Sequence, residues 1–154
     1  MSKYKPYIIS LLLTFAVAVL GGIVTYKGRE NYMQLIQPPL SPPEWLFPVV
    51  WSVLFILMAV GAARVYIKGG EVISKEIIIY AVQLIFNFLW CVFFFGIGAY
   101  LFAFVWLLAL IGLVFAMTVL FYRVDKPSGL MQIPYLLWLC FAAYLNIAVY
   151  LLNY

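Results

Sequence analysis

A few amide and tryptophan side chains are the residues that could do chemistry inside a chain that is otherwise almost entirely apolar. Gln83, Asn87 and Trp90 are spaced i, i+4 and i+7, so on a helix they share one face. Phe94 continues that face, and Asn146 is a further amide in a later apolar segment. An aromatic wall with a few amide or indole donors suits a flat, apolar ligand that carries a few polar substituents.

Two other apolar segments carry aromatic faces with the same helical spacing. These faces are formed by Trp51 and Phe55 in one segment, and by Pro134, Trp138, Ala142 and Leu145 in the other. Each residue also has a purely structural interpretation, because membrane amides often bond only to a neighbouring helix and tryptophans often lie at the membrane interface. On the residues alone, a shared pocket and plain helix packing therefore both stay open.

The chain offers few groups for conventional catalysis or metal binding. It has no histidine, and Cys91 and Cys140 both lie in apolar segments, so we expect no zinc or other transition-metal centre. No Asp, Glu, Lys or Arg lies near the middle of an apolar segment, which argues against a proton pump and against acid–base catalysis. The nine Lys and Arg residues are scattered singly or in pairs, so they do not form the basic face that nucleic-acid binding requires.

The elements that must position these residues are membrane-spanning helices. The chain is 68% apolar and 9% charged, with a mean hydropathy of +1.13, whereas a soluble domain carries roughly 25% charged residues. A bilayer core requires about twenty consecutive apolar residues, and five segments reach that length: 7–26, 45–67, 77–95, 99–122 and 130–152. The sequence therefore predicts an all-α integral membrane protein whose residues 1–154 form a single domain, a five-transmembrane-helix bundle.

Positive charge is divided unequally between the two ends of this bundle. Five crossings leave only Lys27 and Arg29 on the side of the long loop 27–44. By the positive-inside rule, we expect a multi-pass protein of a prokaryotic cell membrane, with the N-terminus in the cytoplasm and the loop 27–44 outside. The basic residues on the N-terminal side are Lys3, Lys5, Arg64, Lys68, Lys75, Arg123 and Lys126.

The long loop ends in a segment that is rich in proline, "QPPLSPPEWLFP". Within it, "SPPE" fits a capping box, with Ser41 as the N-cap of the second helix and Glu44 reaching back to it. Pro48 then lies one turn into that helix and is expected to bend it. A flexible linker would be rich in glycine and serine instead. The sequence therefore predicts a stiff lid over the pocket.

Three stretches of the chain resemble the TspO/translocator protein family, also called the peripheral-type benzodiazepine receptor family. "QPPLSPPEWLFPVVWSVLF" resembles the signature of its first loop and second helix, and "LIFNFLWCVFFF" resembles its third-helix motif. "LMQIPYLLWLCFAAYLN" resembles its fifth-helix motif. The resemblance covers nearly the whole chain and implies the same number of helices as the hydropathy pattern.

The resemblance implies a membrane receptor or binding protein for tetrapyrroles, such as protoporphyrin IX or a haem-like molecule, and for other hydrophobic small molecules. Such a protein would act as a sensor in stress or porphyrin regulation, with the lipid bilayer as its surroundings and no required cofactor. The family motifs and the aromatic faces together give the expected ligand-binding residues, with the loop residues closing the pocket. These residues are Tyr32, Pro38, Pro42, Trp51, Phe55, Asn87, Trp90, Trp138, Ala142 and Leu145.

The sequence departs from the family pattern in two places. Trp106 stands where many members carry an acidic residue early in the fourth helix. The sterol-recognition motif of animal members needs a basic residue at the end of the fifth helix, and "YLNIAVYLLNY" has none. A loose match to a sterol motif covers residues 119–126 instead.

Other functions and an oligomer also stay open. Some related proteins degrade protoporphyrin in light, and in such an enzyme Trp51 and Trp138 could donate electrons to the excited porphyrin. A transporter of porphyrins or other lipophilic ligands is the third possibility, although an ion-coupled one would need intramembrane charges. Ala109, Gly112 and Ala116 form a stripe of small residues that serves either packing within the bundle or a homodimer.

Overall fold

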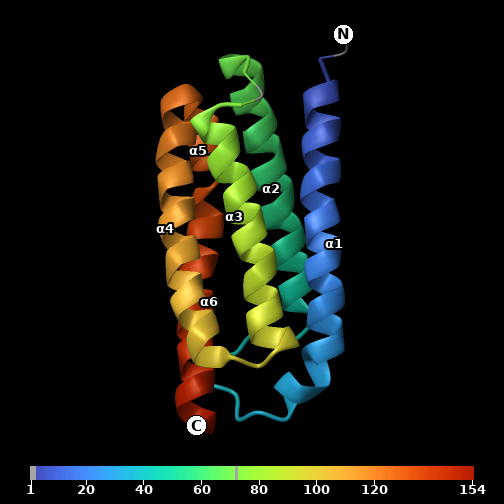
Figure 1. The fold of residues 1–154 in the computed structure, drawn as a ribbon, viewed down its shortest axis with the longest axis vertical. Helices are drawn as coiled ribbons and strands as arrows, with labels where there is room; N and C mark the ends of the chain where they lie inside the picture. The colour runs from blue at the N-terminus through green and yellow to red at the C-terminus, as the bar shows by residue number, and fades with distance from the viewer. Residues whose placement is uncertain (1–2, 72) are drawn as a thin grey trace.

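The computed structural model describes residues 3–71 and 73–154, and within these residues the chain forms helices and no strands. Five long helical segments run along the long axis of the molecule, with α1 at one edge of the bundle (Figure 1). Each segment is long and apolar enough to cross a membrane, which confirms the predicted all-α bundle of five transmembrane helices. The elements are α1 (Lys5–Met33), α2 (Leu46–Gly69), α3 (Lys75–Cys91), a π-helical turn η1 (Val92–Gly96), α4 (Tyr100–Val124), α5 (Lys126–Leu130) and α6 (Ile133–Asn153).

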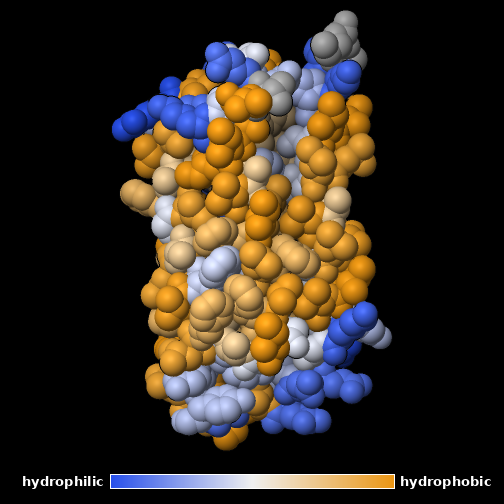
Figure 2. Space-filling model, viewed as in Figure 1, coloured by the Kyte–Doolittle hydropathy of each residue, from blue (hydrophilic) through white to orange (hydrophobic). Residues whose placement is uncertain are grey.

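The outer surface of the bundle is apolar along most of its length. On the face shown in Figure 2, hydrophobic residues cover the middle and hydrophilic residues gather at the two ends. Large exposed apolar side chains occur on all five long helical segments, among them Leu12, Val53, Ile85, Phe115 and Leu137. A surface of this kind must be covered by hydrocarbon. The chain is therefore a multi-pass integral membrane protein in contact with the lipid bilayer.

Helix α1 is longer than the apolar segment 7–26 from which it was predicted. It continues to Met33 through Lys27, Arg29 and Glu30, which are good helix formers. Apolar counting finds only the part of a helix that lies in hydrocarbon, whereas helical hydrogen bonding continues into the interface. The connecting loop is consequently 34–45, and Tyr32 lies on the helix.

The capping box predicted in "SPPE" is wrong. Helix α2 begins at Leu46 and has no side-chain cap. The hydroxyl of Ser41 donates instead to the Pro38 carbonyl oxygen, at 2.7 Å. Glu44 forms an ion pair with Arg29, which is brought beside the loop because α1 extends beyond the predicted span.

The late start of α2 also changes the role of Pro48. Leu46 is the first helical residue, so Pro48 lies in the first turn. The N–H groups of a first turn have no partner within the helix, and a proline there removes no hydrogen bond. The physical reason for predicting a bend at Pro48 is therefore absent.

A π-helical turn ends the third membrane segment and turns Phe94 into the bundle. The N–H of Ile97 donates to the Val92 carbonyl oxygen, at 2.8 Å, which closes the wide turn. Gly98 follows with a φ of 74°, a value that favours glycine, and α4 begins two residues later. Phe94 is only 4% exposed and packs against Tyr100, with ring centroids 4.9 Å apart.

The last membrane segment is broken by a corner that the sequence did not predict. The Asp125 carboxylate accepts the backbone N–H of Ser128, at 3.3 Å, and so caps the short helix α5. Gly129 lies so close to α4 that a Cβ placed on it would be 2.6 Å from Tyr122 Cα. Helix α6 then starts at Ile133, three residues later than the predicted span 130–152.

Candidate ligand-binding site

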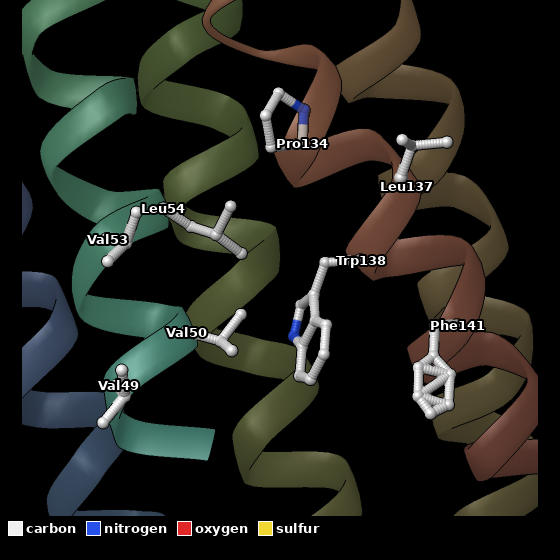
Figure 3. A pocket seen from close by; sticks show the side chains of 8 residues that line it. All are labelled: Val49, Val50, Val53, Leu54, Pro134, Leu137, Trp138 and Phe141. Atoms are coloured by element: carbon white, nitrogen blue, oxygen red, sulfur yellow. The ribbon is translucent and has the colours of Figure 1, made fainter. Parts of the chain in front are cut away.

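An open groove separates α2 from α6 on the lipid-facing side of the bundle (Figure 3). Its volume is about 500 Å³, within the range of roughly 300–1,000 Å³ that is typical of small-molecule sites. No charged side chain lines it. The lining residues are Val49, Val50, Val53 and Leu54 from α2, and Pro134, Leu137, Trp138 and Phe141 from α6.

Trp138 projects from α6 toward α2 and lines the groove (Figure 3). Its ring packs edge-on against Phe47 and Phe141, with centroids 5.9 Å and 5.5 Å away. The indole Nε1 is buried and donates to no acceptor among the residues that the structure describes. A buried donor without a partner costs about 1–3 kcal/mol. Because this atom is closed to solvent, an acceptor in the groove can pair with it only after the indole ring or a neighbouring side chain moves.

Trp51 is not among the residues that line the groove. Its ring contacts Phe55 and Tyr135, with centroids 5.6 Å and 6.2 Å away. Phe55 is 7% exposed and Tyr135 is fully buried. The structure thus packs Trp51 against a buried ring of α2 and a buried ring of α6, outside the lining of the groove.

Asn87 belongs to a buried chain of hydrogen bonds. Its Nδ2 donates to the Tyr135 hydroxyl, at 2.8 Å, and that hydroxyl donates to Gln83 Oε1, also at 2.8 Å. Gln83 Nε2 in turn faces the Met58 sulfur at 3.7 Å. Because Nδ2 of Asn87 already donates to Tyr135, this N–H can donate to a ligand only if it exchanges Tyr135 for that ligand.

Trp90 is engaged in a second polar chain toward the loop end of the bundle. Its Nε1 donates to Asn146 Oδ1, at 3.1 Å, and Asn146 Nδ2 donates to the Tyr100 carbonyl oxygen, at 2.8 Å. The ring stacks on Phe94 at 5.2 Å, and Tyr32 of α1 also contacts Phe94, at 5.5 Å. The structure therefore groups Trp90 with Tyr32, apart from the groove between α2 and α6.

The other predicted residues occupy the wall and the loop end. Ala142 is half-buried and Leu145 is buried, and both lie on α6. In the loop, Pro38 is buried and Pro42 is half-buried.

The loop 34–45 is fastened to α6. The N–H of Ile36 donates to Asn153 Oδ1 at 2.9 Å, and Asn153 Nδ2 donates back to the Ile36 carbonyl oxygen at 3.1 Å. The Tyr144 hydroxyl donates to the Pro39 carbonyl oxygen at 2.6 Å. In Figure 1 the loop crosses beneath the bundle from α1 to the end of α6. It closes this end of the bundle, whereas the groove opens sideways.

Tyr135 and Phe141 are the functional candidates that the sequence interpretation missed. Tyr135 links both amides of α3 to α6, and Phe141 forms one side of the groove. A signal for each was available, because Tyr135 is a hydroxyl inside an apolar helix and Phe141 follows Trp138 at i+3, on the same helical face.

Five apolar helices, a lipid-facing groove and buried amide networks define a multi-pass α-helical membrane protein. The model of the TspO/MBR family matches residues 10–152, and the chain belongs to this family.

Individual relatives span most of the chain. The Tryptophan-rich protein TspO of Chlorobaculum tepidum is 36% identical, over 92% of this chain and 91% of its own length. The Tryptophan-rich sensory protein of Cereibacter sphaeroides is 34% identical, over 94% of this chain and 92% of its own length. The human Translocator protein is 33% identical, over 80% of this chain and 75% of its own length.

Proposed function

We propose that this protein is a membrane receptor that binds tetrapyrroles, such as protoporphyrin IX or a haem-like molecule, and other flat hydrophobic molecules, in the groove between α2 and α6. The observation that carries the proposal is the buried, unpaired indole N–H of Trp138 in an otherwise apolar groove. A ligand that places an acceptor there removes a penalty of about 1–3 kcal/mol.

A porphyrin suits this groove by shape and by chemistry. Its ring is flat and apolar, so it can cover the aliphatic surface of Val49, Val53 and Leu137 and pack against the aromatic ring of Phe141. Its carboxylate side chains are strong acceptors for the Trp138 N–H. A ligand position deeper between α2 and α6 would involve Trp51, Phe55, Ala142 and Leu145, which do not line the open groove.

The loop and the second polar chain complete the proposed site. Pro38 and Pro42 stiffen the loop that closes the bundle end, and Tyr32 with Trp90 supports that closure from α1 and α3. The name of the Cereibacter sphaeroides relative contains the word "sensory", which supports a role as a sensor. The signal of ligand binding would then pass through the loop 34–45, which is attached to α6.

Titration with protoporphyrin IX tests the proposal. Tryptophan fluorescence quenching is measured on the wild type and on the Trp138→Phe variant, which keeps an aromatic ring and removes the N–H. We expect the variant to bind about tenfold more weakly, because it loses a hydrogen bond to a charged acceptor. Trp45→Phe is the matched control, since Trp45 is 67% exposed and lies outside the groove. Unchanged affinity in both Trp138→Phe and a Trp51→Ala, Trp138→Ala double variant would place the ligand elsewhere.

The same preparation distinguishes the two alternative functions. Illumination of the porphyrin complex, followed by absorbance, tests for light-dependent degradation, in which Trp51 and Trp138 would be the electron donors. Bleaching no faster than in detergent alone argues for a receptor. Uptake of porphyrin into proteoliposomes, with and without an ion gradient, tests for transport, to which the name of the human relative points.

We also propose that the N-terminus lies in the cytoplasm and the loop 34–45 outside, in a prokaryotic cell membrane. The unequal distribution of lysine and arginine between the two ends supports this orientation. Single cysteines at Gln37 and at Glu71, in a variant without Cys91 and Cys140, test it with a membrane-impermeant maleimide. Labelling of intact cells at position 71 and not at position 37 would reverse the orientation.

A homodimer is proposed on the stripe of small residues along α4. Ala109 and Gly112 are exposed, and a Cβ placed on Gly112 would meet nothing within 4 Å. These two residues therefore do not serve packing within the bundle. Cross-linking of Gly112→Cys in membranes tests whether the stripe faces a second copy.

A further inference from the structure

A second groove lies where α4 meets α5 and α6, at the end of the bundle that carries the N-terminus. Its volume is about 400 Å³, and it shares no residue with the groove between α2 and α6. Val119, Leu130 and Ile133 line it with aliphatic surface, and Leu130 and Ile133 are 49% and 40% exposed. The aliphatic lining of this groove is therefore suited to contact with a hydrocarbon chain.

The shape of this groove is fixed by backbone packing. Gly129 of α5 lies against Tyr122 of α4 so closely that any larger residue would meet the α4 backbone. The Asp125 carboxylate caps α5 and accepts the Ser128 hydroxyl, which holds the corner in place. The packing of this corner against α4 thus helps to shape the groove.

Two cations stand at the rim of this groove without an acidic partner. Arg123 lines the groove and is exposed, and within residues 3–71 and 73–154 it forms no ion pair or hydrogen bond. Lys126 is exposed, and its Nζ lies 5.8 Å from the centre of the Tyr122 ring. The nearby Asp125 is buried and already pairs with Arg64 and Lys68, at 2.8 Å and 2.6 Å. The rim is therefore positively charged.

We propose that this groove binds an anionic phospholipid, with an acyl chain along Val119 and Ile133 and the phosphate group on Arg123 and Lys126. The combination of an apolar channel and a cationic rim favours this occupant. A zwitterionic lipid would bring a second cation to the rim, and a soluble anion would leave the apolar walls uncovered. Tyr122 orients the headgroup, because its ring holds Lys126 at the rim.

Native mass spectrometry of the detergent-solubilised full chain tests the proposal. The probes are phosphatidylglycerol and phosphatidylcholine with the same two acyl chains. We expect the wild type to retain phosphatidylglycerol selectively, and we expect the Arg123→Gln, Lys126→Gln double variant to bind it about tenfold more weakly. The matched control is Lys5→Gln, Lys75→Gln, which removes the same charge at the same end of the bundle and should bind normally.

A second pair of variants tests the apolar part of the site. Val119→Trp fills the groove and should abolish the selective adduct, whereas Leu108→Trp, on the lipid-facing surface of the same helix, should keep it. Addition of inorganic phosphate in excess should not displace the lipid. Loss of the adduct with phosphate would instead indicate a site for a free anion and would overturn the proposal.

Three further outcomes would contradict the proposed site. Equal retention of phosphatidylglycerol and phosphatidylcholine would mean that the rim does not select the headgroup. An equal loss in the Lys5→Gln, Lys75→Gln control would mean that general surface charge is responsible. Selective retention by Val119→Trp would mean that the acyl chain lies elsewhere.

Discussion

Tyr135 of α6 and Asn87 of α3 are joined by a hydrogen bond of 2.8 Å in the middle of the bundle. The same hydroxyl donates to Gln83 Oε1, so its removal leaves two buried amides short of a partner. We expect Tyr135→Phe to lower the free energy of unfolding by about 1–3 kcal/mol. Thermal unfolding in detergent measures this loss. Tyr26→Phe is the control, because Tyr26 is 73% exposed, and an equal loss there would show that the network is not responsible.

Trp138 and Trp90 should respond in opposite directions to the same substitution. Trp138→Phe removes a buried N–H that has no partner, so we expect the ligand-free protein to gain about 1 kcal/mol in stability. Trp90→Phe removes a donor to Asn146 and should lose stability by a similar amount. Apparent unfolding temperatures of the two variants measure the difference. A loss in ligand-free Trp138→Phe as large as the loss in Trp90→Phe would indicate that the Trp138 N–H already has an acceptor.

Gly28 and Gly22 offer a matched pair on α1. A Cβ on Gly28 would lie 2.1 Å from the Phe95 carbonyl oxygen, whereas a Cβ on Gly22 would meet nothing within 4 Å. We expect Gly28→Ala to push α1 away from η1 and to reduce stability by about 1–3 kcal/mol. Gly22→Ala should be neutral or stabilising by up to about 1 kcal/mol, because alanine is the better helix former. Unfolding temperatures compare them, and equal values would disprove the close approach.

Asp125 should make the stability of the protein depend on pH at the acid end. The Arg64 guanidinium, with Lys68 and Ser128, holds the pKa of the buried Asp125 carboxyl well below its usual range, against the opposing effect of burial. As the pH falls below about 4, the unfolded chain takes up this proton first, and stability declines toward the folded pKa.

The Asp125→Asn variant tests this dependence. It should be less stable at neutral pH by roughly 2–3 kcal/mol, because two cations lose a charged partner. It should also show a flatter decline of the unfolding temperature from pH 5 to pH 3 than the wild type. Glu71→Gln, which removes an exposed carboxyl group, should keep the wild-type curve. If the unfolding temperature of Asp125→Asn declined with pH as steeply as that of the wild type, groups other than Asp125 would cause the acid sensitivity.

The attachment of the loop 34–45 to α6 should control access to the closed end of the bundle. We expect an Asn153→Ala, Tyr144→Phe double variant to increase hydrogen exchange at the Ile36 amide by about tenfold, since three hydrogen bonds across the contact are lost. Tyr150→Phe on the same helix is the control. Unchanged exchange at Ile36 would show that the loop is held by other contacts.

The fold was largely predictable from the sequence because the bilayer restricts it. Five apolar segments of spanning length allow only a helical bundle, and the structure confirms this. The ends of the helices were less predictable. The sequence motif around Ser41 favours a local cap, but the structure pairs Glu44 with Arg29, and that contact exists only because α1 extends past the hydrocarbon.

The sequence predicted which residues could belong to the candidate site, but it did not predict how they are arranged in space. Spacing on one helix shows which residues share a face, so Trp138 was found from the sequence alone. Spacing cannot show how two helices are rotated against each other, and the structure places Trp138 in the lining of the groove and Trp51 against Tyr135, outside that lining. The partner of Asn87 was also hidden, because Tyr135 lies 48 residues away in the chain.

The sideways opening between α2 and α6 determines how affinity must be expressed for any molecule that uses it. A compound reaches the groove after it has dissolved in the surrounding hydrocarbon, so occupancy follows its mole fraction in the lipid and not its concentration in water. Adding empty vesicles or detergent micelles at constant protein then dilutes the compound and weakens apparent binding in proportion. Comparisons between two compounds are meaningful only after each has been corrected for its own partition coefficient.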